Sequence, residues 1–137
     1  MMLTNVGWKI VEVGPRVGGF RHELYSAAYN INHAINDLLV RGGKKPVIPK
    51  KLVAYSAYYK IYGRTEGHIT DITGLHMLQE LPSLVSMVRD LYTGEATRFA
   101  KNGGAPLFHL FFMNKDMQAM NHDINRMEHE LKVTIAK

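Results

Sequence analysis

The sequence lacks cysteine entirely, and it also lacks any long apolar run. Without cysteine, a disulfide scaffold, a thiolate zinc site, an iron–sulfur cluster and a cysteine nucleophile are all excluded. A membrane-spanning helix needs about 18 consecutive apolar residues, and no segment reaches that length. Residues 1–8 carry neither the basic segment nor the apolar run of a secretory leader. We therefore expect a cytoplasmic protein that does not associate with membranes.

Recognisable catalytic motifs are missing as well. There is no G-x-S-x-G elbow, no paired acidic signature and no H-E-x-x-H metal-binding pair. His68-Ile69-Thr70 resembles the H-x-T element of two-histidine phosphoesterases, but that chemistry requires a second copy, which the other histidines do not supply. His109 lies in an apolar segment, as a hydrogen-bonded core histidine would. We predict no catalytic residue, no metal site and no cofactor, and we favour a binding protein over an enzyme.

The chain combines an ordinary globular composition with one concentrated basic feature. Of its 137 residues, 46% are hydrophobic and 21% are charged, which is typical of a single folded domain. The formal net charge of +5 arises from one segment, because the other 12 basic residues balance the 12 acidic ones. Such a segment can attract phosphates or an acidic partner, or it can be a solvated loop. Its five cations are Arg41, Lys44, Lys45, Lys50 and Lys51.

Residue periodicity predicts an α+β fold in a single domain spanning 1–137. An alternating β-branched run predicts a strand near 8–13, and a run that is apolar on both faces predicts an interior strand near 107–113. The longest helical pattern covers 21–41, with a Gly-Gly stop after it. The apolar positions of this helix, expected to face the core, are Leu24, Ala28, Ile31, Ile35 and Leu38.

A long amphipathic helix is predicted near the C-terminus, capped by Asn114. Segment 52–62 fits either a helix or a strand, and the flanking Pro49 and Gly63 favour the helix. Residues 65–73 have the composition of a polar turn. We therefore expect a helix-dominated domain around a small sheet. Further helical patterns cover 74–81, 83–92 and 95–101.

The glycine-rich connection between the first strand and the first helix is a candidate anion site. Free amides at a helix start, beside glycines that let an anion approach the backbone, favour phosphate. The spacing matches neither the dinucleotide fingerprint nor the phosphate loop, so an ordinary connection is the alternative. The residues predicted to bind the anion are Arg16, Gly18, Gly19 and Arg21.

The basic segment 41–51 is a second candidate site. Two glycines bend it, two prolines stiffen it, and four tyrosines follow it, a combination that suits single-stranded nucleic acid. In the alternative, Arg41 and Lys44 interact only with the end of the preceding helix, and the tyrosines pack in the core. The residues predicted to bind nucleic acid or a nucleotide-like ligand are Arg41, Lys44, Lys45, Lys50 and Lys51.

A narrow apolar stripe runs along the predicted C-terminal helix with alternating spacings of three and four. This 3.5-residue period is typical of a coiled-coil seam, and it predicts a homo-oligomer. The alternative is that the helix packs on the core of its own domain. The predicted interface residues are Met117, Met120, Ile124, Met127 and Leu131.

Together these features predict a non-catalytic, oligomerising binding protein that presents a basic Gly/Pro loop to an anionic partner, either nucleic acid or a nucleotide-like ligand. Two other functions stay open. A structural or accessory subunit would use the methionine stripe and the basic loop to dock on other proteins. A small phosphate-handling enzyme would use the glycine-rich connection at 14–21 together with a histidine.

Overall fold

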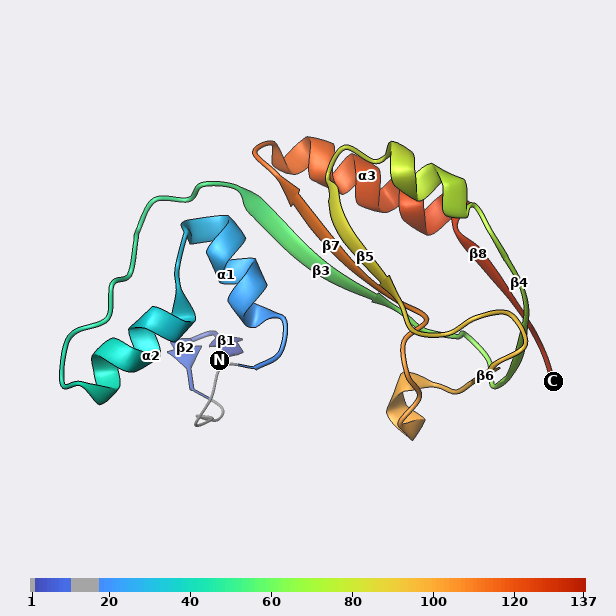
Figure 1. Cartoon of the computed structure of the whole chain (residues 1–137), viewed down its shortest axis with the longest axis horizontal. Helices are drawn as coiled ribbons and strands as arrows, with labels where there is room; N and C mark the ends of the chain where they lie inside the picture. The colour runs from blue at the N-terminus through green and yellow to red at the C-terminus, as the bar shows by residue number, and fades with distance from the viewer. Residues whose placement is uncertain (1, 11–17) are drawn as a thin grey trace.

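A computed structural model describes residues 2–10 and 18–137 of the chain (Figure 1). Helix and strand occur in nearly equal shares, 32% and 30%, so the α+β class is confirmed. The elements in chain order are β1 (Met2–Thr4), β2 (Gly7–Lys9), α1 (Arg21–Tyr29), α2 (His33–Arg41), β3 (Tyr55–Ile61), β4 (Gly67–Thr73), η1 (Leu75–Glu80), β5 (Leu84–Arg89), β6 (Ala96–Thr97), η2 (Ala100–Asn102), β7 (Phe108–Asn114), α3 (Met117–Glu130) and β8 (Lys132–Ala136).

The main sheet is antiparallel and has the order β3-β7-β5, with β7 in the middle. This confirms the interior strand that the apolar run near 107–113 predicts. Alternate residues of β7 point to opposite faces. Phe108, Leu110 and Phe112 are fully buried in the core cluster, whereas His109 is only half-buried. The core therefore lies on one side of this sheet.

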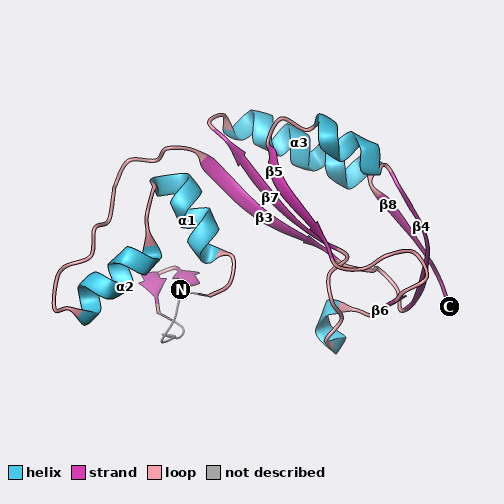
Figure 2. Cartoon of the chain, in the orientation of Figure 1, coloured by secondary structure: helices cyan, strands magenta, loops and turns pink. Residues whose placement is uncertain are grey.

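Helix α3 covers that face of the sheet, beside η1 (Figure 2). Its N-cap is Asp116, whose side chain accepts a hydrogen bond from the Gln118 amide at 2.8 Å, so the prediction that Asn114 caps the helix is wrong. The buried Asp123 accepts from the Ser83 amide at 2.9 Å and ties the helix to the start of β5. The second sheet, β6-β4-β8, follows at the far end of α3.

Several segments predicted as helix or turn are strands. Segment 52–62 contains β3, 65–73 contains β4, and 83–92 contains β5. In each case a neighbouring strand supplies the backbone partners, and that pairing outweighs weak local helix preferences. The helical pattern at 95–101 contains β6 and the short turn η2.

The predicted helix over 21–41 is two helices. Asn30 ends α1 in the left-handed conformation, with φ 58°, and the Asn32 side chain caps α2 by accepting from the Ile35 amide at 3.0 Å. Asparagine tolerates both conformations, which explains the break. The predicted stop is confirmed, because Gly42 is the C-cap of α2. Of the strand predicted near 8–13, β2 includes only Trp8 and Lys9, and residues 11–13 lie outside the described ranges.

The segment before β3 has almost no core of its own. Among the described residues that precede β3, only Ala28 and Ala54 are buried. Two hydrogen bonds hold α1 to the main sheet, from the Val53 amide to the Ala28 carbonyl at 2.7 Å and from the Ser56 hydroxyl to the Leu24 carbonyl at 3.0 Å. Figure 1 shows α1 and α2 at one end of the molecule and α3 over the sheet.

Candidate anion-binding and docking surfaces

The basic loop, residues 42–54, runs as an extended arc from α2 to β3 (Figure 1). Its middle is fixed to α2, because the Asn36 side-chain amide donates to the Val47 carbonyl and accepts from the Val47 amide, both at 2.8 Å. The loop is therefore anchored even though its side chains are exposed. Four lysines of this loop are exposed, and none of them forms an ion pair within residues 2–10 and 18–137. They are Lys44, Lys45, Lys50 and Lys51.

Arg41, the fifth predicted cation, is engaged locally. Its Nε lies 2.7 Å from the Asp37 carboxylate, one helical turn earlier on α2. This agrees with the alternative that Arg41 belongs to the helix end. An exposed pair of this kind is weak, so an anion that competes with Asp37 can still attract the guanidinium.

The glycine-rich connection before α1 is described only from Gly18 onward, and Arg16 lies outside the described residues. The Arg21 amide donates to the Gly18 carbonyl at 3.0 Å, and the Arg21 guanidinium lies so close to Gly18 that a Cβ there would collide with it. No side chain caps the start of α1 at Phe20. Figure 1 shows the turn that leads into α1 and the basic loop that leaves α2 on different sides of these two helices.

The predicted interface stripe faces the chain's own core. Met120, Met127 and Leu131 are buried in the core cluster, and Ile124 packs against it. Only Met117, 48% exposed, is open to solvent. These buried side chains are therefore covered within one chain, as the alternative for this stripe expects. Self-association of the chain stays a prediction.

One polar chain crosses the other face of the main sheet. The Tyr58 hydroxyl lies 2.9 Å from Nδ1 of His109, and Nε2 of His109 lies 2.8 Å from the Asp90 carboxylate. Because a carboxylate only accepts, Nε2 carries a proton, and in the neutral imidazole the Tyr58 hydroxyl donates to Nδ1. His109 is thus hydrogen-bonded on both sides, as predicted, but it is only half-buried and lies outside the core cluster, so its prediction as a core residue is wrong. Burial, followed by the charges of Glu23 and Asp90, raises the pKa of Tyr58.

The sequence prediction missed an exposed apolar area, here termed the α2 surface. It consists of Ile35, Leu38 and Val40 on the helix and of Val47 and Ile48 in the basic loop, all exposed. With 3.6 residues per turn, Ile35 and Leu38 share one face of α2, whereas Val40 lies toward Asn36, which is hydrogen-bonded to Val47. The helical period predicts that Ile35 and Leu38 face the core, and this is wrong, because both are exposed, Leu38 by 70%. No residue of α2 is buried. The amphipathic pattern predicts a buried face, but no segment within residues 2–10 and 18–137 buries Ile35 or Leu38.

Two further findings bear on chemistry and location. Within the described ranges, no three His, Asp or Glu side chains converge as metal ligands would. In the same ranges, none of the helices combines the length and the apolar character needed to cross a lipid bilayer.

Comparisons with known proteins bear on the fold. The sequence matches no known family model, and no curated protein resembles it significantly. An L-amino acid ligase from Bacillus licheniformis aligns over 94% of this chain with a TM-score of 0.71 and 16% identity. An N5-carboxyaminoimidazole ribonucleotide synthetase from Thermotoga maritima aligns over 98% with a TM-score of 0.59 and 18% identity. The chain covers only 33% and 35% of those two chains, so the likeness is of fold over about one third of each enzyme.

Proposed function

We propose that this chain is a non-catalytic module of a ligase-type protein, and that it docks through the α2 surface on the rest of the ligase fold. The observation that carries the proposal is the exposure of Ile35, Leu38 and Val40 on a helix that buries nothing. Large apolar side chains left exposed on a helix are a feature of interaction sites.

The size of the matched enzymes supports a specific partner. Both are named as enzymes that join molecules, and this chain aligns with about one third of the length of each. The remaining two thirds of such a fold is the natural cover for the α2 surface, whether it lies on the same polypeptide or on a separate one. The module would then complete a ligase and would not act alone.

Photo-cross-linking tests this proposal. A photoreactive amino acid replaces Leu38 on the α2 surface, and a matched control replaces the exposed Asn121 on α3. We expect position 38, but not position 121, to cross-link to polypeptide outside this chain that has the remaining part of a ligase fold. Adducts only to a second copy of the chain, or equal labelling at both positions, would overturn the proposal.

A second function is favoured by the anchored basic loop. Lys44, Lys45, Lys50 and Lys51 are exposed and unpaired among the described residues, and Asn36 holds the middle of the loop in place. We propose that the loop attracts a phosphate-bearing partner, either nucleic acid or a nucleotide-like ligand. The ribonucleotide in the name of the Thermotoga maritima enzyme is a ligand of this class and supports the smaller of these two partners.

A further inference from the structure

A cavity of about 520 Å³ opens where the end of β3, the end of α3 and the start of β8 meet. This volume is within the range of small-molecule sites in proteins. None of the residues predicted to bind an anion lines this cavity. Its lining residues are Tyr59, Lys60, Ile61, Tyr62, Arg64, Met127, Glu128, His129, Leu131, Lys132 and Val133.

The inner wall of the cavity is apolar. Met127 and Leu131 are buried members of the core cluster, and Ile61 and Val133 pack against that cluster. Their positions are thus fixed by the fold. Tyr62 adds an aromatic ring that is half-buried. Such a wall favours a ligand with an apolar or aromatic body.

The rim of the cavity is mainly cationic. Arg64 and Lys132 are exposed and take part in no ion pair within the described ranges. The ammonium of Lys60 does not belong to this rim, because it lies over the Phe20 ring, 5.6 Å from the centroid. Among the lining residues the only carboxylate is that of Glu128, which accepts a hydrogen bond from the Tyr59 hydroxyl. Two cations are therefore available to an incoming anion.

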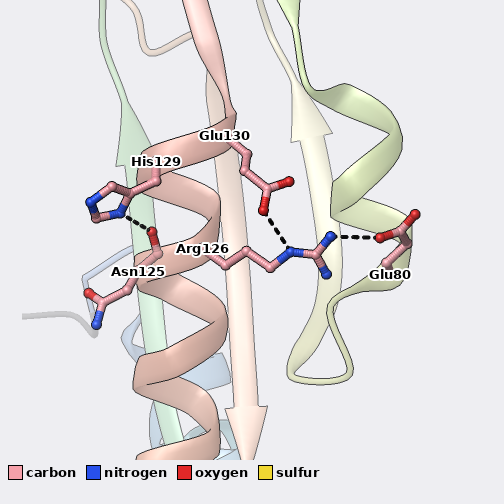
Figure 3. Close-up of polar contacts among 5 residues, drawn as sticks. All are labelled: Glu80, Asn125, Arg126, His129 and Glu130. Carbon is pink, nitrogen blue, oxygen red and sulfur yellow. Dashed lines mark hydrogen bonds and ion pairs between the residues drawn. The ribbon is translucent and has the colours of Figure 1, made fainter.

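Two neighbouring polar groups of α3, Arg126 and His129, point to opposite sides of the helix (Figure 3). Arg126 is occupied by Glu80 at 2.7 Å and by Glu130 at 2.8 Å, on the other side of the helix, so it does not compete for a ligand. The His129 ring donates from Nδ1 to the Asn125 carbonyl at 2.7 Å. Since a carbonyl only accepts, Nδ1 carries the proton, and Nε2 is left for a ligand.

We infer that this cavity is a binding site for a small organic anion in which a phosphate or carboxylate is joined to an aromatic body. The anion lies between Arg64 and Lys132, and the body lies against the apolar wall. Guanidinium and ammonium groups pair well with both kinds of anion. This site is independent of the α2 surface and of the basic loop.

The test titrates the purified chain with four probes and follows amide shifts by NMR. AMP and phenylacetate each combine an anion with an aromatic ring, whereas inorganic phosphate and adenosine supply only one of the two parts. We expect AMP, phenylacetate or both to shift the amides of Tyr62, Arg64 and Lys132. Phosphate and adenosine should each bind at least about tenfold more weakly than the combined ligand. Comparison of AMP with phenylacetate distinguishes phosphate from carboxylate.

Variants localise the binding. Arg64→Gln and Lys132→Gln should each weaken binding about tenfold, whereas Arg98→Gln, an exposed arginine outside the cavity, should not. Val133→Trp, which fills the cavity, should remove binding while circular dichroism stays native. The inference is overturned if no combined probe shifts these amides, if the shifts fall only on 44–51, or if Arg98→Gln weakens binding as much as Arg64→Gln.

Discussion

At the scale of single residues, the most connected group is the chain of hydrogen bonds from Tyr58 through His109 to Asp90. Phe20 stacks on the Tyr58 ring with a centroid separation of 4.5 Å and an interplanar angle of 10°. Tyr58 therefore joins the residue that precedes α1 to the exposed face of the main sheet. Its contacts link the start of α1 to the main sheet.

Tyr58 should give the protein a distinct alkaline instability. Burial and two nearby carboxylates hold its pKa above the usual value near 10 in the folded state. The folded state thus binds the phenolic proton more tightly, so this stabilisation is complete below the unfolded pKa and is lost as pH rises through the folded pKa. Urea denaturation at pH 8 and at about pH 11 measures the free energy of unfolding. We expect this free energy to fall more between the two pH values for wild type than for Tyr58→Phe. An equal fall would contradict this assignment.

The four loop lysines should control binding to nucleic acid. Because Arg41 already pairs with Asp37, we assign four cations to the contact. Four phosphate contacts on duplex DNA predict a slope of log K against log salt of about −3.6. The Lys44/Lys45/Lys50/Lys51→Ala variant should lose this binding and keep wild-type stability.

Fluorescence anisotropy across a salt series measures this slope. Lys101/Lys115/Lys137→Ala, which removes exposed lysines outside the loop, is the control and should bind like wild type. A salt-independent affinity, or unchanged binding in the loop variant, would contradict the prediction.

At the scale of elements, α3 shows how one stripe can suit two environments. The 3-4 spacing that is typical of a coiled-coil seam also fits a helix that packs on a sheet. In this chain the stripe of α3 packs on the main sheet. The stripe divides into a buried part and an exposed end at Met117. The two parts should respond differently to substitution.

Met127→Ala should destabilise the protein by about 2–5 kcal/mol, because it leaves a cavity in the core. Met117→Ala is the matched control on the same helix and should change the free energy of unfolding by less than about 0.5 kcal/mol. Thermal or urea denaturation measures both. Ile124→Asp should likewise destabilise the chain, since Ile124 packs against the core. If instead the wild type is a dimer and the Ile124→Asp variant is a stable monomer, the result would favour the predicted coiled-coil interface.

At the scale of the whole molecule, burial is uneven along the chain. The core cluster draws its members from Ile69 to Leu131, whereas the described residues before β3 bury only Ala28 and Ala54. Figure 1 shows α1 and α2 at one end of the molecule, and α1 is joined to the main sheet by the hydrogen bonds of Val53 and Ser56 and by the stacking of Phe20 on Tyr58. The proposed docking on a larger ligase fold would bury the α2 surface and so make burial more even along the chain.

Native-state hydrogen exchange should show the same asymmetry. Regions with few buried apolar contacts open at low free-energy cost. We expect the amides of α1 and α2 in the isolated chain to exchange well before those of β7 and α3. Addition of a partner that covers the α2 surface should slow the exchange of α2. Equal protection of α2 and β7 in the isolated chain would show that the N-terminal helices are stable without cover.

The sequence by itself determined the features that depend on local pattern. Composition, or periodicity within a short window, accounts for the absence of cysteine, the single basic segment, the interior strand predicted near 107–113, the long C-terminal helix and the stop at Gly42. Helix amphipathicity likewise showed that α2 has an apolar face, although it could not show what covers that face.

Only the tertiary structure decided the features that depend on distant partners. Segments 52–62 and 83–92 are strands because β7, far along the chain, pairs with both. The partners of His109 lie 51 and 19 residues away, so no local pattern identifies Tyr58 or Asp90. The cavity has the same origin, since β3, α3 and β8 meet only in the fold. Local sequence gives each segment only a weak preference for helix or strand. Strand pairing and core packing in the folded protein decide which of the two forms.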